Sequence, residues 1–72
     1  MTKEKIIELL SQLVEAGGGK AVDTIRDMDI RDITKLNEIG LVIIDRKRQM
    51  FRDNVWVDIT YKGKEFISEN VG

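Results

Sequence analysis

Residues 36–44 read LNEIGLVII, and this stretch decides the fold. A pattern of polar and apolar residues with helical spacing ends at a single glycine, Gly40, and the apolar run Leu41 to Ile44 follows directly. Glycine readily takes the left-handed conformation that ends a helix, and a short β-branched run is typical of a strand. The stretch therefore predicts a helix that ends at Gly40 and passes directly into a strand.

Upstream of Gly40, the predicted helix has two distinct sides. Its apolar side consists of Ile30, Ile33 and Leu36. Its opposite side consists of Arg31, Lys35 and Glu38. Because aspartate caps helices well, either Asp27 or Asp29 is expected to begin this segment.

Downstream, a second strand is predicted by strict alternation. Val55, Val57 and Ile59 alternate with Trp56 and Asp58, which is the period of a strand with one buried face. We expect the two strands to pair as an antiparallel hairpin. Its tip lies within residues 46–54, where Asp53-Asn54 is the best local turn signal, and its register stays open.

Three further helices complete the expected order. Thr2 is positioned to cap an amphipathic helix from Lys3 to about Ala16, which the three glycines at 17–19 end. A short second helix is predicted over residues 20–28, with one buried face made of Ala21, Val22, Ile25 and Met28. Thr60 is expected to cap a last helix whose inward residues are Phe66, Ile67 and Val71. The predicted class is α+β, in the order helix, helix, helix, strand, strand, helix.

Composition restricts the chemistry. The 72 residues are expected to form one domain, residues 1–72, and they include no cysteine and no histidine. Disulfides, a thiolate nucleophile, imidazole acid/base catalysis and the usual zinc ligands are thereby excluded. We expect no cofactor and a cytoplasmic location. The apolar run of residues 41–44 is far shorter than the roughly 20 residues that span a bilayer, so no membrane partner is expected.

Four carboxylates lie close together in the sequence: Asp23, Asp27, Asp29 and Asp32. Such a group is compatible with a divalent cation or an acid/base pair, and equally with helix caps on a solvated surface. The calcium-loop pattern lacks its central glycine and its terminal bidentate glutamate. We therefore expect caps and a solvated surface, no metal and no enzyme.

The order of elements, together with two local phrases, resembles the winged helix-turn-helix superfamily. LNEIGLV, residues 36–42, looks like a recognition helix that runs into the first wing strand, and ITYKGKEF, residues 59–66, is similar to the Leu-Thr-x-x-Gly pattern that leads into a closing helix. The resemblance implies three helices, a two-stranded antiparallel wing and a short C-terminal helix. It also suggests the small regulators of phages, archaeal viruses and mobile elements. Two departures are the short second and third helices and the aspartates at the start of the third.

The resemblance implies binding to double-stranded DNA, with the third helix in the major groove and the wing on the phosphate backbone. The base-reading candidates are Arg31, Thr34 and Lys35. The phosphate candidates are Arg46, Lys47, Arg48 and Arg52 of the wing, with Lys20 at the start of the second helix. The alternatives are a solvated helix face holding ion pairs such as Arg31 with Asp27 or Glu38 with Lys35, and an ordinary solvated hairpin.

The net charge of −1 and the acidic start of the third helix support a second hypothesis, a winged-helix adaptor that docks on another protein without binding DNA directly. Its interface candidates are Met50, Phe51 and Trp56, large apolar residues of the types enriched at interfaces. The alternative is that one of them completes a small core. The homodimer that a palindromic site requires stays open.

Overall fold

The structure, a computed structural model, describes residues 2–45 and 55–71. Their elements, in chain order, are α1 (Lys3–Glu15), β1 (Gly19–Ala21), the short 3-10 turn η1 (Val22–Thr24), α2 (Ile30–Glu38), β2 (Val42–Asp45), β3 (Trp56–Ile59) and α3 (Tyr61–Val71). This described part belongs to the α+β class, with three α-helices and one three-stranded antiparallel sheet.

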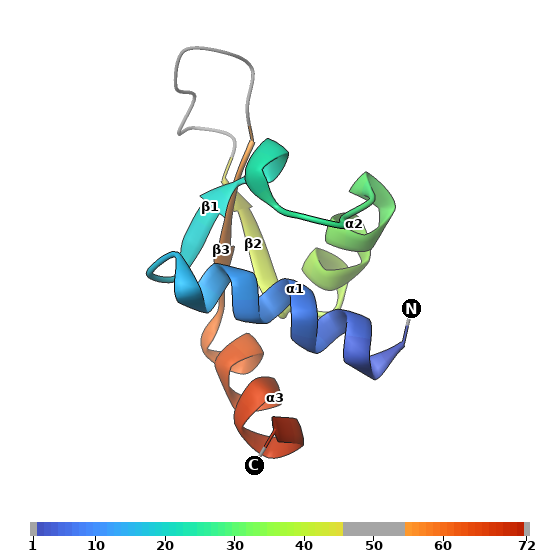
Figure 1. The fold of residues 1–72 in the computed structure, drawn as a ribbon, viewed down its shortest axis with the longest axis vertical. Helices are drawn as coiled ribbons and strands as arrows, with labels where there is room; N and C mark the ends of the chain where they lie inside the picture. The colour runs from blue at the N-terminus through green and yellow to red at the C-terminus, as the bar shows by residue number, and fades with distance from the viewer. Residues whose placement is uncertain (1, 46–54, 72) are drawn as a thin grey trace.

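The strand β3 is the centre of the sheet, and β1 and β2 flank it in the order β1-β3-β2 (Figure 1). Both pairings are antiparallel, and Val57 lies opposite Lys20 on one side and Ile44 on the other. In Figure 1, α1 crosses the sheet, α2 lies beside β2, and α3 continues from the end of β3. The predicted antiparallel pairing of β2 with β3 is confirmed, and the register that the sequence left open is Val42 opposite Ile59.

Local capping interactions set the helix ends. The Thr2 hydroxyl oxygen accepts from the Lys5 backbone N–H at 3.2 Å and begins α1, as predicted. Asp29, the second of the two expected caps, begins α2 through a capping box with Asp32. Gly40, at φ 83°, ends the same helix in the left-handed region. The positions of these caps explain why the predicted bounds of α1 and α2 agree closely with the structure.

The core lies between α1 and the sheet and is completed by α2. Its buried apolar residues are Leu9, Leu10, Leu13, Ile25, Ile33, Leu36, Leu41, Val42, Val57 and Ile59. Phe66 and Ile67 of α3 pack against this cluster, as expected, whereas the predicted inward side chain of Val71 lies outside the described ones. Of the three residues on the predicted apolar side of α2, Ile33 and Leu36 are buried, whereas Ile30 is 60% exposed. A helical side chain covers the turn that precedes it in the helix. Ile30 is the first residue of α2, so no helical turn lies before it.

The predicted second helix over residues 20–28 is also wrong. Lys20 and Ala21 belong to β1, and the 3-10 turn η1 follows. Hydrogen bonds to the central strand hold this segment: the Ile59 N–H donates to the Gly18 carbonyl and the Val22 N–H to the Val55 carbonyl, both at 2.8 Å. A helix of this length gains little by itself, whereas strand pairing satisfies an open edge of β3. The sheet therefore has three strands rather than the two of the predicted wing.

Two segments far apart in sequence meet where α2 ends and α3 begins. The Thr60 hydroxyl accepts from the Gly63 N–H at 3.0 Å, so that it caps α3 as predicted, and donates to the Gly40 carbonyl at 2.6 Å. The Lys62 ammonium donates to the Ile39 carbonyl at 3.0 Å. These bonds satisfy carbonyls at the end of α2 and hold that helix in a defined position against the start of α3.

A buried glutamine holds the segment between η1 and α2 against α1. The Gln12 side chain is 5% exposed; its amide N–H donates to the Arg26 carbonyl at 3.0 Å, and its oxygen accepts the Arg26 N–H at 2.8 Å. The Lys5 ammonium adds a bond to the Asp27 carbonyl, where the backbone takes the positive φ of 56°. A backbone segment without regular structure is thereby fixed by side chains of α1.

Replacing Gln12 with leucine is expected to lower the free energy of unfolding by about 2 kcal/mol, because it leaves the N–H and carbonyl of Arg26 without partners. Chemical denaturation measures the change. Gln12→Glu keeps the acceptor and loses the donor, so its stability should fall between those of the wild type and Gln12→Leu at neutral pH. A leucine variant as stable as the wild type would show that this bridge contributes nothing.

Candidate nucleic-acid interface

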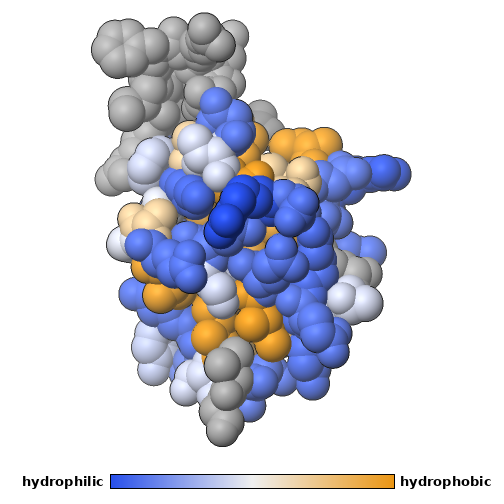
Figure 2. All heavy atoms as spheres, in the orientation of Figure 1, coloured by the Kyte–Doolittle hydropathy of each residue, from blue (hydrophilic) through white to orange (hydrophobic). Residues whose placement is uncertain are grey.

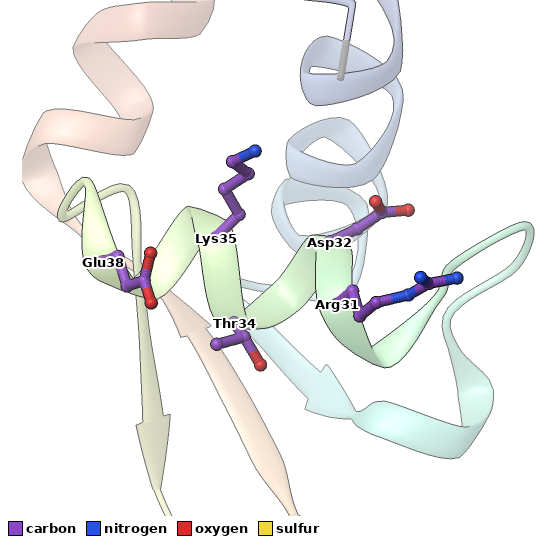
Figure 3. Close-up of a pocket in the computed structure, with 5 residues that line it drawn as sticks. All are labelled: Arg31, Asp32, Thr34, Lys35 and Glu38. Atoms are coloured by element: carbon purple, nitrogen blue, oxygen red, sulfur yellow. The ribbon is translucent and has the colours of Figure 1, made fainter.

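The exposed face of α2 forms a shallow surface hollow of about 330 Å³. Its lining residues are Arg31, Asp32, Thr34, Lys35 and Glu38 (Figure 3). In Figure 3, Lys35 and Asp32 extend from one side of α2 and Thr34 from the other, while Arg31 and Glu38 lie toward the two ends. The three predicted base-reading residues, Arg31, Thr34 and Lys35, are therefore all exposed and all line this hollow.

Arg31 is held at the start of this face by the N-cap residue. The Asp29 carboxylate accepts twice from Arg31: at Oδ1 from the backbone N–H at 3.0 Å, and at Oδ2 from the Nη2 group at 3.1 Å. The Arg31 side chain is nevertheless 88% exposed, and that of Asp29 is 48% exposed. Asp29 therefore fixes one edge of a guanidinium that stays open to solvent.

The same contacts shift both titrations. The pKa of Asp29 lies below its ordinary value, because the Arg31 backbone N–H and then the Arg31 side chain donate hydrogen bonds to its charged form. The pKa of Arg31 is raised, chiefly by the hydrogen bond to Asp29. Both groups are charged at neutral pH, so that the pair carries no net charge. The sequence suggested Asp27 as the partner of Arg31, but the structure pairs Arg31 with Asp29.

Thr34 and Lys35 differ in the donor and acceptor groups that remain available for an outside contact. The Thr34 hydroxyl donates to the Ile30 carbonyl one turn earlier, at 3.0 Å. Its hydrogen is therefore already used, and its oxygen and methyl group remain for an outside contact. The alternative ion pair of Lys35 with Glu38 is not formed among the described residues. The Lys35 ammonium is an exposed positive charge on this face.

Lys20 does not join this surface. It was expected at the N-terminus of a helix, where the helix dipole assists anion binding, but it lies on strand β1 and is half-buried. That strand is at the opposite edge of the sheet from β2, against which α2 packs (Figure 1). The contribution of a helix dipole at Lys20 is therefore excluded.

The remaining phosphate candidates, Arg46, Lys47, Arg48 and Arg52, lie outside the described residues, as do Met50 and Phe51. The structure does describe the two strands that this segment joins. Asp45 at the end of β2 lies opposite Trp56 at the start of β3. The four cations thus belong to the connection between two adjacent antiparallel strands.

Trp56 is the one interface candidate within the described residues. It is half-buried, and its indole N–H donates to the Asp58 carboxylate at 2.9 Å. A Cβ added at Gly19 would lie only 2.7 Å from the indole nitrogen, so the ring packs closely over β1. Trp56 is thus packed against β1 on one side and partly exposed on the other.

A second surface hollow, of about 270 Å³, lies between α1 and the segment that follows η1. It is lined by Glu8, Ser11, Gln12, Glu15, Arg26 and Asp27. Three carboxylates beside one guanidinium disfavour a phosphate here. Figure 2 shows hydrophilic residues over most of the face that α1 crosses, with smaller apolar areas between them. Sequence reasoning did not find this hollow, because it depends on how a loop packs on α1.

The structure places no group of three or more Asp, Glu, His or Cys where it would hold a metal ion, within residues 2–45 and 55–71. None of the helices in that part of the chain combines the length and the apolarity needed to cross a membrane. Comparison with protein-family models, with curated proteins and with solved structures found no match to this chain.

Proposed function

We propose that this chain is a winged-helix DNA-binding regulator. In this proposal, the exposed face of α2 enters the major groove, and the connection between β2 and β3 grips the phosphate backbone. The observation that carries the proposal is that a basic connection joins the two strands directly after α2. Along the chain, α2 is thus followed by two paired strands whose connecting sequence carries four cations.

The fold supports the proposal from α2 onward. The helix α2 ends at Gly40, β2 and β3 form an antiparallel hairpin, and Thr60 leads into α3, in the order that the winged-helix resemblance implies. The bonds of Thr60 and Lys62 fix the end of α2 against α3. A helix held in this way is suited to reading DNA, because little conformational freedom is lost when it binds.

The charge distribution localises the attraction for DNA. Four cations, Arg46, Lys47, Arg48 and Arg52, lie in the connection, whereas the whole chain has a net charge of −1. The field of the whole protein therefore does not attract a polyanion. Contacts between this connection and phosphates would supply the sequence-independent part of the affinity.

On α2, the three exposed side chains have different roles in the proposal. Arg31 offers the bidentate donors that guanine O6 and N7 accept, and Lys35 reaches a base edge or a phosphate. Thr34 offers its methyl group and an acceptor oxygen, because its hydrogen is bonded to Ile30. Asp32 and Glu38 on the same face would repel phosphates, so this face is suited to bases more than to backbone.

Binding of the wild-type chain to a labelled random-sequence duplex tests the proposal. We expect binding at low salt, followed by fluorescence anisotropy, that weakens as salt rises, with about 0.9 in the log–log slope for each phosphate neutralised. Amide NMR shifts should change on α2 and at the ends of β2 and β3, and not around the acidic hollow of Glu8 and Glu15. A chain that binds no duplex at low salt would contradict the proposal.

A second candidate function, docking on another protein, is favoured by a different observation. Large apolar side chains are exposed at Ile39 after α2, at Ile43 of β2 and at Tyr61 in the first turn of α3. A protein partner that covers these side chains would shift their amide signals and would bind almost independently of salt. The two functions thus predict opposite salt dependence and different NMR maps.

A further inference from the structure

Asp29 is the only carboxylate that forms an ion pair with a predicted base-reading side chain, within the part of the chain that the structure describes. Its Oδ2 atom accepts a hydrogen bond from the Nη2 group of Arg31, while the guanidinium remains largely in solvent. A guanidinium has five N–H donors in a fixed plane. Occupying one edge leaves donors on the other edges for an outside acceptor.

We infer that Asp29 is a positioning residue that presents Arg31 to guanine and withholds it from phosphate. This inference rests on the proposed function. Two physical effects support it. A long side chain fixed before binding loses less rotamer freedom on binding. The paired carboxylate also cancels the charge of Arg31, so the pair gains little from a phosphate, whereas its free N–H groups still match guanine O6 and N7.

The chain offers a charge-matched control in Asp32, three residues along the same helix turn. Its carboxylate accepts from the Asp29 backbone N–H at 3.3 Å and makes no hydrogen bond to the Arg31 guanidinium. Asp29→Asn and Asp32→Asn each remove one negative charge and keep a side-chain oxygen for the backbone N–H that the carboxylate now accepts from. At the N-cap position, Asp29, asparagine caps as well as aspartate. Only Asp29→Asn places an amide donor where Arg31 Nη2 needs an acceptor.

The experiment begins with sites enriched by the wild-type chain from a pool of duplexes with a randomised centre. Each guanine is then replaced by 7-deazaguanine, which lacks the N7 acceptor. When one particular guanine is replaced, the affinity of the wild type and of Asp32→Asn should fall about tenfold, which is near the lower end of the discrimination that a bidentate contact provides. Asp29→Asn should lose this sensitivity and bind random duplexes with a salt slope steeper by about 0.9, because Arg31 is freed for a phosphate.

A double-mutant cycle separates positioning from general damage. On an Arg31→Ala background, Asp29→Asn should change the deazaguanine sensitivity no further, because the side chain that Asp29 positions is gone. Circular dichroism melting shows that each variant is folded.

Equal deazaguanine sensitivity in the wild type and both asparagine variants overturns the inference and leaves the proposed function standing. The inference is likewise overturned, and the proposed function likewise stands, if replacing any guanine of the enriched sites with 7-deazaguanine leaves the affinity unchanged. A wild-type chain that binds no duplex at low salt overturns both.

Discussion

Replacing Arg46, Lys47, Arg48 and Arg52 together with alanine is expected to weaken binding to random duplex DNA at low salt by about a hundredfold or more. The salt slope should fall by up to about 3.6, since each lost phosphate contact removes about 0.9. The rest of the chain, which is net acidic, offers no compensating attraction. Fluorescence anisotropy at a series of salt concentrations measures both quantities.

A matched pair of variants separates the position of these cations from their charge. Arg46→Ala with Lys47→Ala removes two positive charges from the connection, and Lys3→Ala with Lys64→Ala removes two from exposed helical positions. We expect only the first pair to reduce the slope by about 1.8. Equal effects of the two pairs, or unchanged affinity of the fourfold variant, would contradict phosphate binding by this connection.

Replacing Gly63 with alanine is expected to lower the free energy of unfolding by about 3 kcal/mol. Gly63 is buried in the first turn of α3, where an added Cβ would collide with the Leu41 carbonyl oxygen and lie 2.7 Å from Ile59 Cγ1. Both neighbours belong to the packed sheet region and have little room to move. The higher helix propensity of alanine, about 1 kcal/mol, is too small to offset this collision.

Two further alanine substitutions identify the cause of such a loss. Gly17 has a φ of 87° and open space around its Cβ position, so Gly17→Ala isolates the conformational cost, about 1 kcal/mol. Ser68 is exposed on α3, and Ser68→Ala should change stability by less than about 0.5 kcal/mol. If Gly63→Ala were no worse than Ser68→Ala in urea denaturation, close packing of α3 on Leu41 would be wrong.

Interactions between near neighbours in the chain account for the correct sequence predictions. Thr2, Asp29 and Thr60 cap helices through bonds to backbone groups within three residues. Alternation over residues 55–59 and the glycine at Gly40 define β3 and the end of α2 in the same local way. The exposed face of α2 could also be predicted from the sequence, because helical spacing alone puts Arg31, Thr34 and Lys35 on the polar side of the helix.

The predicted second helix failed because the structure of its segment depends on a distant partner. Residues 20–28 have helical periodicity, but the edge of β3 recruits Lys20 and Ala21 as a strand. Gln12 is polar, yet it is buried because its side chain donates to and accepts from the backbone of Arg26, 14 residues away. Neither partner can be identified from nearby sequence.

The stretch of residues 36–44 by itself determined that a helix ends at Gly40 and a strand follows, because a left-handed glycine and a β-branched run act locally. The tertiary structure alone decided that β3 is the centre of a three-stranded sheet and that Thr60 joins α3 to the end of α2. Strand pairing and buried hydrogen bonds connect residues far apart in the chain, and their free energy exists only once the whole domain has assembled.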